Sequence, residues 1–256
     1  METTGPILIL TAGGANPQVV INAVAARFPA VEVVVEQPEG KAEIWRRRTR
    51  KLGAIAATGQ LATMVASRLL KSLAARRSAD ILASYGVSAA ESPALPVHHV
   101  ASLNEPACHQ LLQRLNPSVV VTVSCRLLGR ATLATIPCPI INLHAGINPA
   151  YRGQMGGYWS LVENDAANFG ATVHLVDAGT DTGGTLYEVR AVRSPRDFIS
   201  TYPLLLTAAA TGIVIRAIED ALAGTLSPRT MPGPSALRFP PTIWTWLWNG
   251  LIRRIW

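Results

Sequence analysis

The sequence has little that could cross-link the chain or bind a metal. It holds only three cysteines, Cys108, Cys125 and Cys138, and they form no CxxC pair. Such an odd and scattered set excludes a disulfide-stapled scaffold, and it does not suggest a zinc site. We therefore expect no metal, and we expect a reducing cytoplasm as the location.

Long apolar runs and targeting signals are also missing. The N-terminus, METTGPILIL, has no basic region ahead of its apolar residues, so we expect no signal peptide. The longest apolar stretch, residues 203–215, is shorter than the roughly 20 residues that a helix needs to span a bilayer. No GxGxxG motif follows the first apolar segment, which argues against a Rossmann oxidoreductase.

Charged residues make up only 15% of the chain and hydrophobic residues 49%, which is typical of a globular protein with a sizeable core. Among the charges, 23 Lys and Arg outnumber 16 Asp and Glu. The resulting net charge of +7 favours an anionic partner. A phosphate, a nucleotide, a nucleic acid and an anionic membrane face would all satisfy it.

The first half of the chain alternates between strand and helix patterns. Short segments at residues 6–12, 31–36, 97–100 and 118–123 predict strands. In the last segment every residue after Ser118 is β-branched, as in a parallel strand buried on both faces. Gly13, Gly14 and Asn16 separate the first strand from a helix predicted over residues 17–28. This arrangement forms either a phosphate-binding site or an ordinary connection.

Residues 41–90 are unusual for an α/β pattern. Basic residues cluster at both ends of residues 41–77, and the apolar residues between the clusters recur at helical spacing: Leu61, Met64, Val65, Leu69, Leu70 and Leu73. We favour a basic helical segment that packs on the sheet and leaves its charged ends in solvent. The other interpretation is a basic amphipathic element that contacts anionic lipid or a polyanionic substrate.

Residues 140–153, IINLHAGINPAYRG, join a short strand to a Pro/Gly-rich loop. Because side chains alternate along a strand, Asn142 and His144 share one face at its carboxyl end, where ligands bind in open α/β sheets. An amide donor beside an imidazole can stabilise a developing oxyanion and transfer a proton. Taken alone, however, the pair is equally well explained by a structural role, in which two polar side chains have their hydrogen bonds satisfied at the end of a strand.

Two downstream motifs favour the catalytic interpretation. A further strand pattern, GATVHLVD, ends in a GTDTGG loop that carries Asp181. Together with NLH followed by YRG, these motifs resemble the folate-dependent formyltransferase family, which includes glycinamide ribonucleotide and methionyl-tRNA formyltransferases and sugar N-formyltransferases. The resemblance covers residues 7 to about 223, apart from the unusual segment. It implies a catalytic triad of Asn142, His144 and Asp181.

The resemblance also implies residues around the triad. It places the folate beside Arg126, Leu127, Leu128, Asp177 and Thr180. It places the substrate and its phosphate beside Gly13, Gly14, Asn16, Tyr151, Arg152 and Gly153, although the glycine loop lacks the family's usual serine and is one residue shorter. Thr172 and His174, which share a strand face, would border Asp181 without reacting.

The expected fold is α/β, with a Rossmann-like, mostly parallel, twisted sheet flanked by helices. The expected reaction moves a formyl group from 10-formyltetrahydrofolate to a primary amine, such as an amino-sugar nucleotide or another phosphorylated amine, without a metal or a nucleic-acid partner. The alternatives are formyl transfer to phosphoribosylglycinamide in purine synthesis, hydrolysis of formyltetrahydrofolate, and a non-catalytic binding protein of the same fold.

Residues 1–224 would form the catalytic domain, and residues 225–256 an irregular extension rich in proline and tryptophan. An extended chain would place Trp244, Trp246 and Trp248 on one face, whereas a helix would place Trp244, Trp248 and Leu251 on one stripe. Such a segment fits packing on its own domain, a homodimer contact, or a peripheral membrane contact. We favour the first two.

Overall fold

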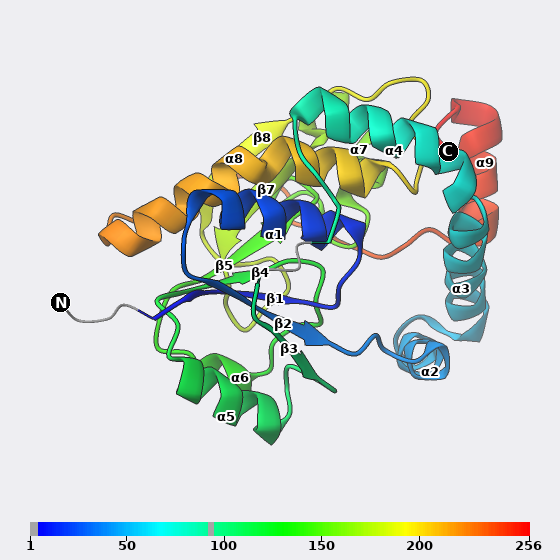
Figure 1. The fold of residues 1–256 in the computed structure, drawn as a ribbon. Coiled ribbons are helices and arrows are strands. Elements are labelled where there is room, and N and C mark those ends of the chain that lie inside the picture. The colour runs from blue at the N-terminus through cyan, green and yellow to red at the C-terminus, as the bar shows by residue number, and fades with distance from the viewer. Residues whose placement is uncertain (1–4, 92–94) are drawn as a thin grey trace.

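A seven-stranded sheet forms the centre of the computed structural model, which describes residues 5–91 and 95–256 (Figure 1). The strands lie in the order β3 (Val97–Val100), β2 (Val31–Glu36), β1 (Ile7–Thr11), β4 (Val119–Thr122), β5 (Ile140–His144), β7 (Gly170–Leu175) and β8 (Thr185–Arg190). The first five are parallel, whereas β7 and β8 pair antiparallel to their neighbours. The predicted mostly parallel α/β sheet is therefore confirmed.

The central strands are buried on both faces because their apolar side chains point alternately up and down. Ile7 and Ile9 of β1 belong to the core under helices α1 (Ala15–Arg27) and α8 (Tyr202–Ala223). Leu8 and Leu10 belong to the opposite core, with α5 (Pro106–Leu115) and α6 (Arg130–Thr135). Figure 1 shows these two helix layers on either side of the sheet.

The strand order reverses between β1 and β4, because the chain goes from β1 to β2 and β3 on one side and then to β4 and β5 on the other. Loops that follow the strands at such a point diverge and leave a crevice at the carboxyl ends. Here the two loops are joined at their bases, where the Ala12 N–H donates to the Ser124 carbonyl at 3.2 Å. The crevice beyond this contact holds the site.

Residues 41–90 form three helices instead of one: α2 (Lys41–Leu52), α3 (Ala54–Leu69) and α4 (Lys71–Tyr85). Only α4 packs along α8, and its Arg77 makes two hydrogen bonds, of 2.7 and 2.9 Å, to the buried carboxylate of Asp197. The prediction that this segment packs its apolar side chains on the sheet is wrong for α3, because Val65 and Leu69 of its apolar stripe face solvent.

The C-terminal residues are more ordered than the sequence predicted. Strand β9 (Leu237–Arg238) pairs with β6 (Arg152–Gly153) in a second, two-stranded sheet, and the chain ends in helix α9 (Ile243–Arg253). The expectation of an irregular tryptophan-rich tail is therefore wrong, and the helical alternative is the correct one. Helix α9 packs on α3 and on α7 (Gly156–Val162), where Asn249 Nδ2 donates to the Tyr158 hydroxyl at 2.9 Å.

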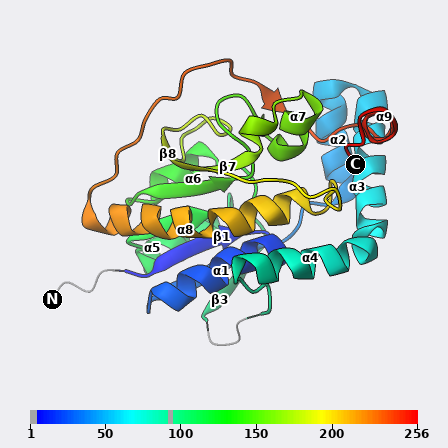
Figure 2. The same ribbon diagram turned by 90° about the horizontal axis from the view of Figure 1, so that it is seen from above.

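The remaining element is a single 3₁₀ turn, η1 (Ala166–Asn168). Seen from above, helices α2, α3 and α9 gather at one end of the molecule (Figure 2). Across residues 5–91 and 95–256, no helix is both long and apolar enough to cross a membrane.

Candidate active site

Asn142 and His144 lie at the carboxyl end of β5, in the crevice where the strand order reverses. Antiparallel pairing with β7 sets Asn142 opposite His174 and His144 opposite Thr172. Because side chains alternate along each strand, these four polar side chains point into the same small region. The sequence predicted the shared face of each strand separately.

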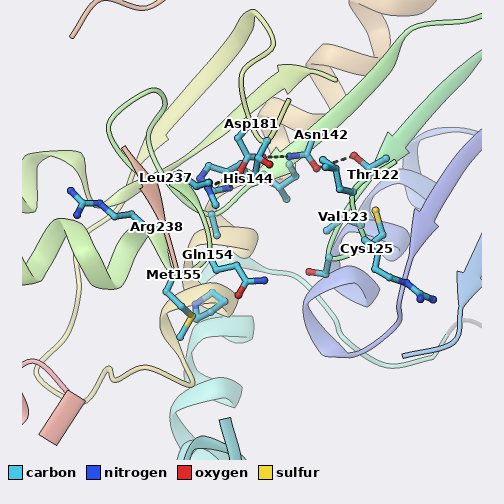
Figure 3. A pocket seen from close by; sticks show the side chains of 18 of the residues that line it. Thr122, Val123, Cys125, Asn142, His144, Gln154, Met155, Asp181, Leu237 and Arg238 are labelled. Carbon is cyan, nitrogen blue, oxygen red and sulfur yellow. Dashed lines mark hydrogen bonds and ion pairs between the residues drawn. The ribbon is translucent and has the colours of Figure 1, made fainter. Parts of the chain in front are cut away.

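Asp181 comes from the loop between β7 and β8, and it lies between the two β5 side chains (Figure 3). Its Oδ1 accepts from Asn142 Nδ2 at 3.2 Å, and its Oδ2 lies 3.5 Å from His144 Nδ1. The Gly153 N–H also donates to Oδ2, at 2.8 Å. The structure thus brings the three triad residues together, with Gly153 holding the carboxylate from the opposite side.

The amide of Asn142 has a fixed orientation. An ionised carboxylate only accepts hydrogen bonds, so the amide nitrogen must face Asp181. The amide oxygen in turn accepts from the Thr122 hydroxyl at 2.8 Å. The second Nδ2 hydrogen points to His174 Nε2 at 3.0 Å, and His174 Nδ1 lies 2.7 Å from the Leu175 carbonyl, which can only accept. His174 is therefore an Nδ1–H tautomer that takes a hydrogen bond from Asn142.

His144 is held in one tautomer by the backbone. Its Nε2 lies 2.7 Å from the Tyr151 carbonyl oxygen, so Nε2 carries the proton and Nδ1 presents its lone pair towards Asp181. Burial lowers the pKa of His144 more than the Asp181 charge raises it, so the pKa lies below its ordinary value. The burial of the ring therefore outweighs the effect of the Asp181 charge.

Asp181 is ionised at neutral pH. Burial alone would raise the pKa of its carboxyl group, but the nearby His144 and the hydrogen bond from the Gly153 N–H lower the pKa to about 2. A proton arriving at the pair therefore goes to His144 Nδ1, next to a permanent negative charge. This arrangement suits a group that accepts a proton during a reaction and then releases it.

A cavity of about 720 Å³ opens in front of the triad. Three non-glycine residues with positive φ line it: Ser124 (51°), Met155 (62°) and Asp181 (51°). Residues held in this sparsely populated conformation cost free energy and gather at functional sites. The crevice thus has the backbone character of a binding site as well as its shape.

The residues predicted to contact the folate all line this cavity: Arg126, Leu127, Leu128, Asp177 and Thr180. Arg126, however, already has most of its donors engaged by protein groups in the structure. Its Nε and backbone N–H donate to the buried carboxylate of Glu36 at 2.7 and 2.6 Å, and its Nη2 donates to the carbonyls of Gln37 and Ala101. Arg126 therefore shapes the loop after β4, and Glu36 is an anchor that the sequence did not reveal.

The residues predicted to contact the substrate divide into two groups. Asn16 and Gly153 line the cavity, although Asn16 lies in the first turn of α1. The other four, Gly13, Gly14, Tyr151 and Arg152, do not line it. The Tyr151 hydroxyl instead donates to Asp165 at 2.7 Å, and Arg152 Nη1 donates to the Thr180 carbonyl at 2.9 Å. Arg152 thus supports the Asp181 loop instead of facing the cavity.

Thr172 and His174 border the triad as predicted from their strand face. Thr172 is fully buried, accepts from the Asn148 N–H and donates to the Gly146 carbonyl, so it fixes the loop after His144. Cys125 also lines the cavity, but burial and then the Glu36 charge raise the pKa of its thiol to about 12. It is therefore not a thiolate nucleophile at neutral pH.

Basic side chains from outside the predicted set also reach the cavity. Arg47 and Lys51 of α2 line one wall, and Arg238 of β9 lines another. Lys51 Nζ lies 5.0 Å from the centroid of the Phe239 ring, so it is held by a cation–π contact while Arg47 pairs with Glu39 at 2.7 Å. Their position depends on how α2 folds back over the strand ends, and no local pattern in the sequence signals that.

Comparison with known sequences matches residues 8–202 to the formyl transferase family. Among curated proteins, the chain is 29% identical over 103 residues to a methionyl-tRNA formyltransferase of Chlorobium chlorochromatii (40% of this chain, 32% of that protein). It is 32% identical over 157 residues to a methionyl-tRNA formyltransferase of Burkholderia pseudomallei (56% of this chain, 45% of that protein). The chain spans less than half the length of these relatives.

Solved structures show the same fold at low sequence identity. A glycinamide ribonucleotide transformylase from Symbiobacterium toebii has a TM-score of 0.56 at 20% identity, covering 93% of this chain and 96% of that one. A sugar N-formyltransferase from Shewanella has a TM-score of 0.57 at 12% identity, covering 91% and 76%. Since the sequence match runs through β5, β7 and the Asp181 loop, the chain belongs to the formyl transferase family of enzymes.

Proposed function

We propose that this protein is an N-formyltransferase that moves the formyl group of 10-formyltetrahydrofolate to a primary amine on a phosphate-bearing acceptor, such as an amino-sugar nucleotide. The observation that carries the proposal is the Asn142–His144–Asp181 arrangement in the cavity wall. It combines an oriented amide donor with a neutral imidazole next to an ionised carboxylate.

The cavity fits a reduced folate next to the triad. Val123, Leu127, Leu128 and Val176 supply an apolar wall beside Asn142. Apolar walls with a few placed polar groups are the usual surroundings of a flat heteroaromatic ring. When bound, the folate supplies a formyl group whose carbonyl oxygen becomes negatively charged as an amine attacks it.

Asn142 would stabilise that charge. The Thr122 hydroxyl donates to the other end of the amide, so Nδ2 is kept on the side of Asp181 and His174. In the resting protein its two hydrogens face Asp181 and His174. An oxyanion is a stronger acceptor than a neutral imidazole, so a hydrogen bond to the reacting oxygen replaces one of these as charge develops.

His144 and Asp181 would carry the proton. A C–N bond to the amine forms, the C–N bond to the folate breaks, and one proton passes from the attacking nitrogen to the departing one. His144 is neutral at neutral pH and has a free Nδ1, so it can accept that proton, and the charge of Asp181 stabilises the imidazolium. No covalent intermediate with the protein is required.

The acceptor's anionic part would lie along the α2 wall. Arg47, Lys51 and Arg238 are cationic, and Asn16 presents an amide at the N-terminal turn of α1, which favours anions. A phosphorylated amine can therefore place its amine near Asp181 and its phosphates near α2. The unusual segment and the C-terminal extension form these walls, which supports a specialised acceptor.

A direct assay tests the proposal. The protein is incubated with 10-formyltetrahydrofolate and single amine acceptors: amino-sugar nucleotides, glycinamide ribonucleotide and charged initiator tRNA. Mass spectrometry would find a formylated product, together with tetrahydrofolate, for an amino-sugar nucleotide in the wild-type protein but not in Asn142→Ala. Release of free formate without any formylated amine would instead identify a hydrolase. Formylation of glycinamide ribonucleotide alone would correct the acceptor class.

A further inference from the structure

On helix α9 the one charged side chain is Arg253, at its last position. Its inward face holds the buried Trp246 and the polar Asn249, which is bonded to Tyr158. Its outward face carries only large apolar side chains with exposed fractions of 44–70%: Trp244, Leu247, Trp248, Leu251 and Ile252. A helix that is apolar on both faces is normally covered on both faces.

The apolar surface continues onto α3. Ile55, Val65 and Leu69 form one stripe along that helix, and Leu69 and Ile55 are 76% and 78% exposed. The two helices are in close contact, because the Trp244 indole lies directly on Gly59, where a Cβ would come within 2.4 Å of it. We call the outward side chains of α3 and α9 the apolar face. Contiguous surfaces of this kind mark sites of interaction.

The segments of the chain that carry the apolar face are strongly basic. Residues 41–77 contain ten Lys or Arg and a single acidic residue, Glu43, and residues 221–256 contain four Arg and no acid. Exposed arginines follow the face on α2, α3 and beyond α9, including Arg46, Arg68 and Arg254. Tryptophan and leucine flanked by Arg and Lys are the composition of elements that lie in the interface of an anionic membrane.

A hollow at the end of α9 extends this pattern. Leu251 of the apolar face lines it together with Trp256, Arg193 and Arg254. In the parts of the chain that the structure describes, neither arginine has an acidic partner within 4.0 Å. Two such guanidinium groups beside exposed apolar side chains suit a phosphodiester whose acyl chains lie alongside.

We infer that the apolar face of α3 and α9 is a docking surface for an anionic phospholipid bilayer, on which the protein lies without spanning it. A second copy of the chain fits the surface less well. A twofold contact would set each basic rim against the same rim of the partner, and like charges oppose such a contact. Anionic headgroups neutralise the rim and the acyl region covers the apolar side chains.

This inference is independent of formyl transfer, because vesicle binding needs neither substrate. Wild-type protein is sedimented with vesicles of phosphatidylcholine alone and with vesicles containing equal amounts of phosphatidylcholine and phosphatidylglycerol. We expect binding to the anionic vesicles, weaker binding at high salt, and little binding to the neutral vesicles. Absence of binding to the anionic vesicles would overturn the inference.

Two variants locate the contact. Trp248→Glu combined with Leu251→Glu should reduce partition onto anionic vesicles by about tenfold or more. Leu222→Glu changes an apolar residue of similar exposure (45%) at the far end of α8, and it should bind as the wild type does. Equal losses in both would show that added negative charge, and not the face, governs binding.

Point changes are used because deleting α9 would uncover Tyr158 and its neighbours. If the double variant does not fold, as judged by circular dichroism, Trp248→Ser replaces it, and quenching of wild-type tryptophan fluorescence by brominated lipids tests insertion directly. Light scattering tests whether a second copy of the chain covers the apolar face instead of a membrane. A wild-type dimer that dissociates in the double variant, without vesicle binding in either, would assign the face to a second copy.

Discussion

Asn142 Nδ2 lies 3.0 Å from His174 Nε2, although the two residues are 32 positions apart in the sequence. The contact exists because β5 and β7 pair antiparallel with these residues in register. One amide hydrogen of Asn142 is donated to His174 and the other to Asp181, so the amide is held rigidly between two acceptors. The predictions about the reaction follow from this arrangement.

The first prediction concerns Asn142. Asn142→Ala should lower kcat by roughly 10²–10³-fold, as the loss of one oxyanion donor does, and leave KM for the folate nearly unchanged. Thr122→Val removes only the hydroxyl that orients the amide, so its loss of kcat should be smaller. Both are measured by steady-state kinetics with thermal unfolding as the check on folding. Full turnover by Asn142→Ala would remove the amide from the mechanism.

The second prediction concerns pH. The ionised Asp181 raises the His144 pKa towards its ordinary value, and burial lowers it. Asp181→Asn removes the first effect only, so the His144 pKa should fall further. The acid limb of the kcat/KM profile should then move to lower pH, while the maximum rate falls. A ring-proton NMR titration of His144 measures the same shift without turnover.

His98→Gln serves as the control for the pH profile, because His98 pairs with Glu32 at 2.7 Å on β2 and β3, away from the cavity. Its acid limb should coincide with that of the wild type. An acid limb that moves to higher pH in Asp181→Asn would show that the carboxylate does not act through the charge of His144.

The third prediction concerns the acceptor. Lys51→Ala should raise KM for a phosphorylated amine by about tenfold, and it should spare KM for the folate, because Lys51 lies on the α2 wall. Arg46→Ala is the matched control, since Arg46 belongs to the same helix and does not line the cavity. If both variants change KM equally, general electrostatic attraction explains the effect better than a specific contact.

The fourth prediction separates Arg152 from the substrate. Arg152 Nη1 bonds the Thr180 carbonyl, next to Asp181. Arg152→Ala should therefore lower kcat by loosening the Asp181 loop, and change KM for the amine little. A variant with normal kcat and a raised KM for the amine would instead place the guanidinium at the phosphate.

The fifth prediction concerns stability. Arg77→Ala leaves the buried Asp197 carboxylate without its cation, so the free energy of unfolding should fall by roughly 3 kcal/mol. Arg196→Ala breaks the exposed pair with Asp80 and should cost less than about 1 kcal/mol. Urea unfolding measures both. Similar losses in the two variants would mean that Asp197 is not the anchor of α4.

Strand alternation is local, so NLH and TVH each predict which side chains share a face. Asp181 joined the predicted triad only through the family resemblance of its loop motif. The partners of the triad could not be predicted in this way. Whether His144 is charged depends on how completely the ring is enclosed. Glu36, the last residue of β2, reaches Arg126 after β4 only because both strands pair with β1.

Periodicity likewise predicted helices in residues 41–90 but not what covers them. The spacing of Val65 and Leu69 indicates an apolar stripe on a helix. The same spacing occurs whether the stripe packs on a sheet, a partner protein or a membrane. Similarly, nothing local placed Lys51 in the cavity wall. Both depend on where α2 and α3 lie relative to the sheet.

The pairing of β6 with β9 makes the C-terminal segment mechanically part of the active site. The Gly153 N–H that holds Asp181 belongs to β6, and β9 is joined to α9 by only a few residues. A displacement of α9 would therefore move the backbone that holds the Asp181 carboxylate, because one short ladder links the two. We expect a ligand that binds on the outer face of α9 to change the affinity of the cavity for its own ligand, and such a coupling acts equally in both directions.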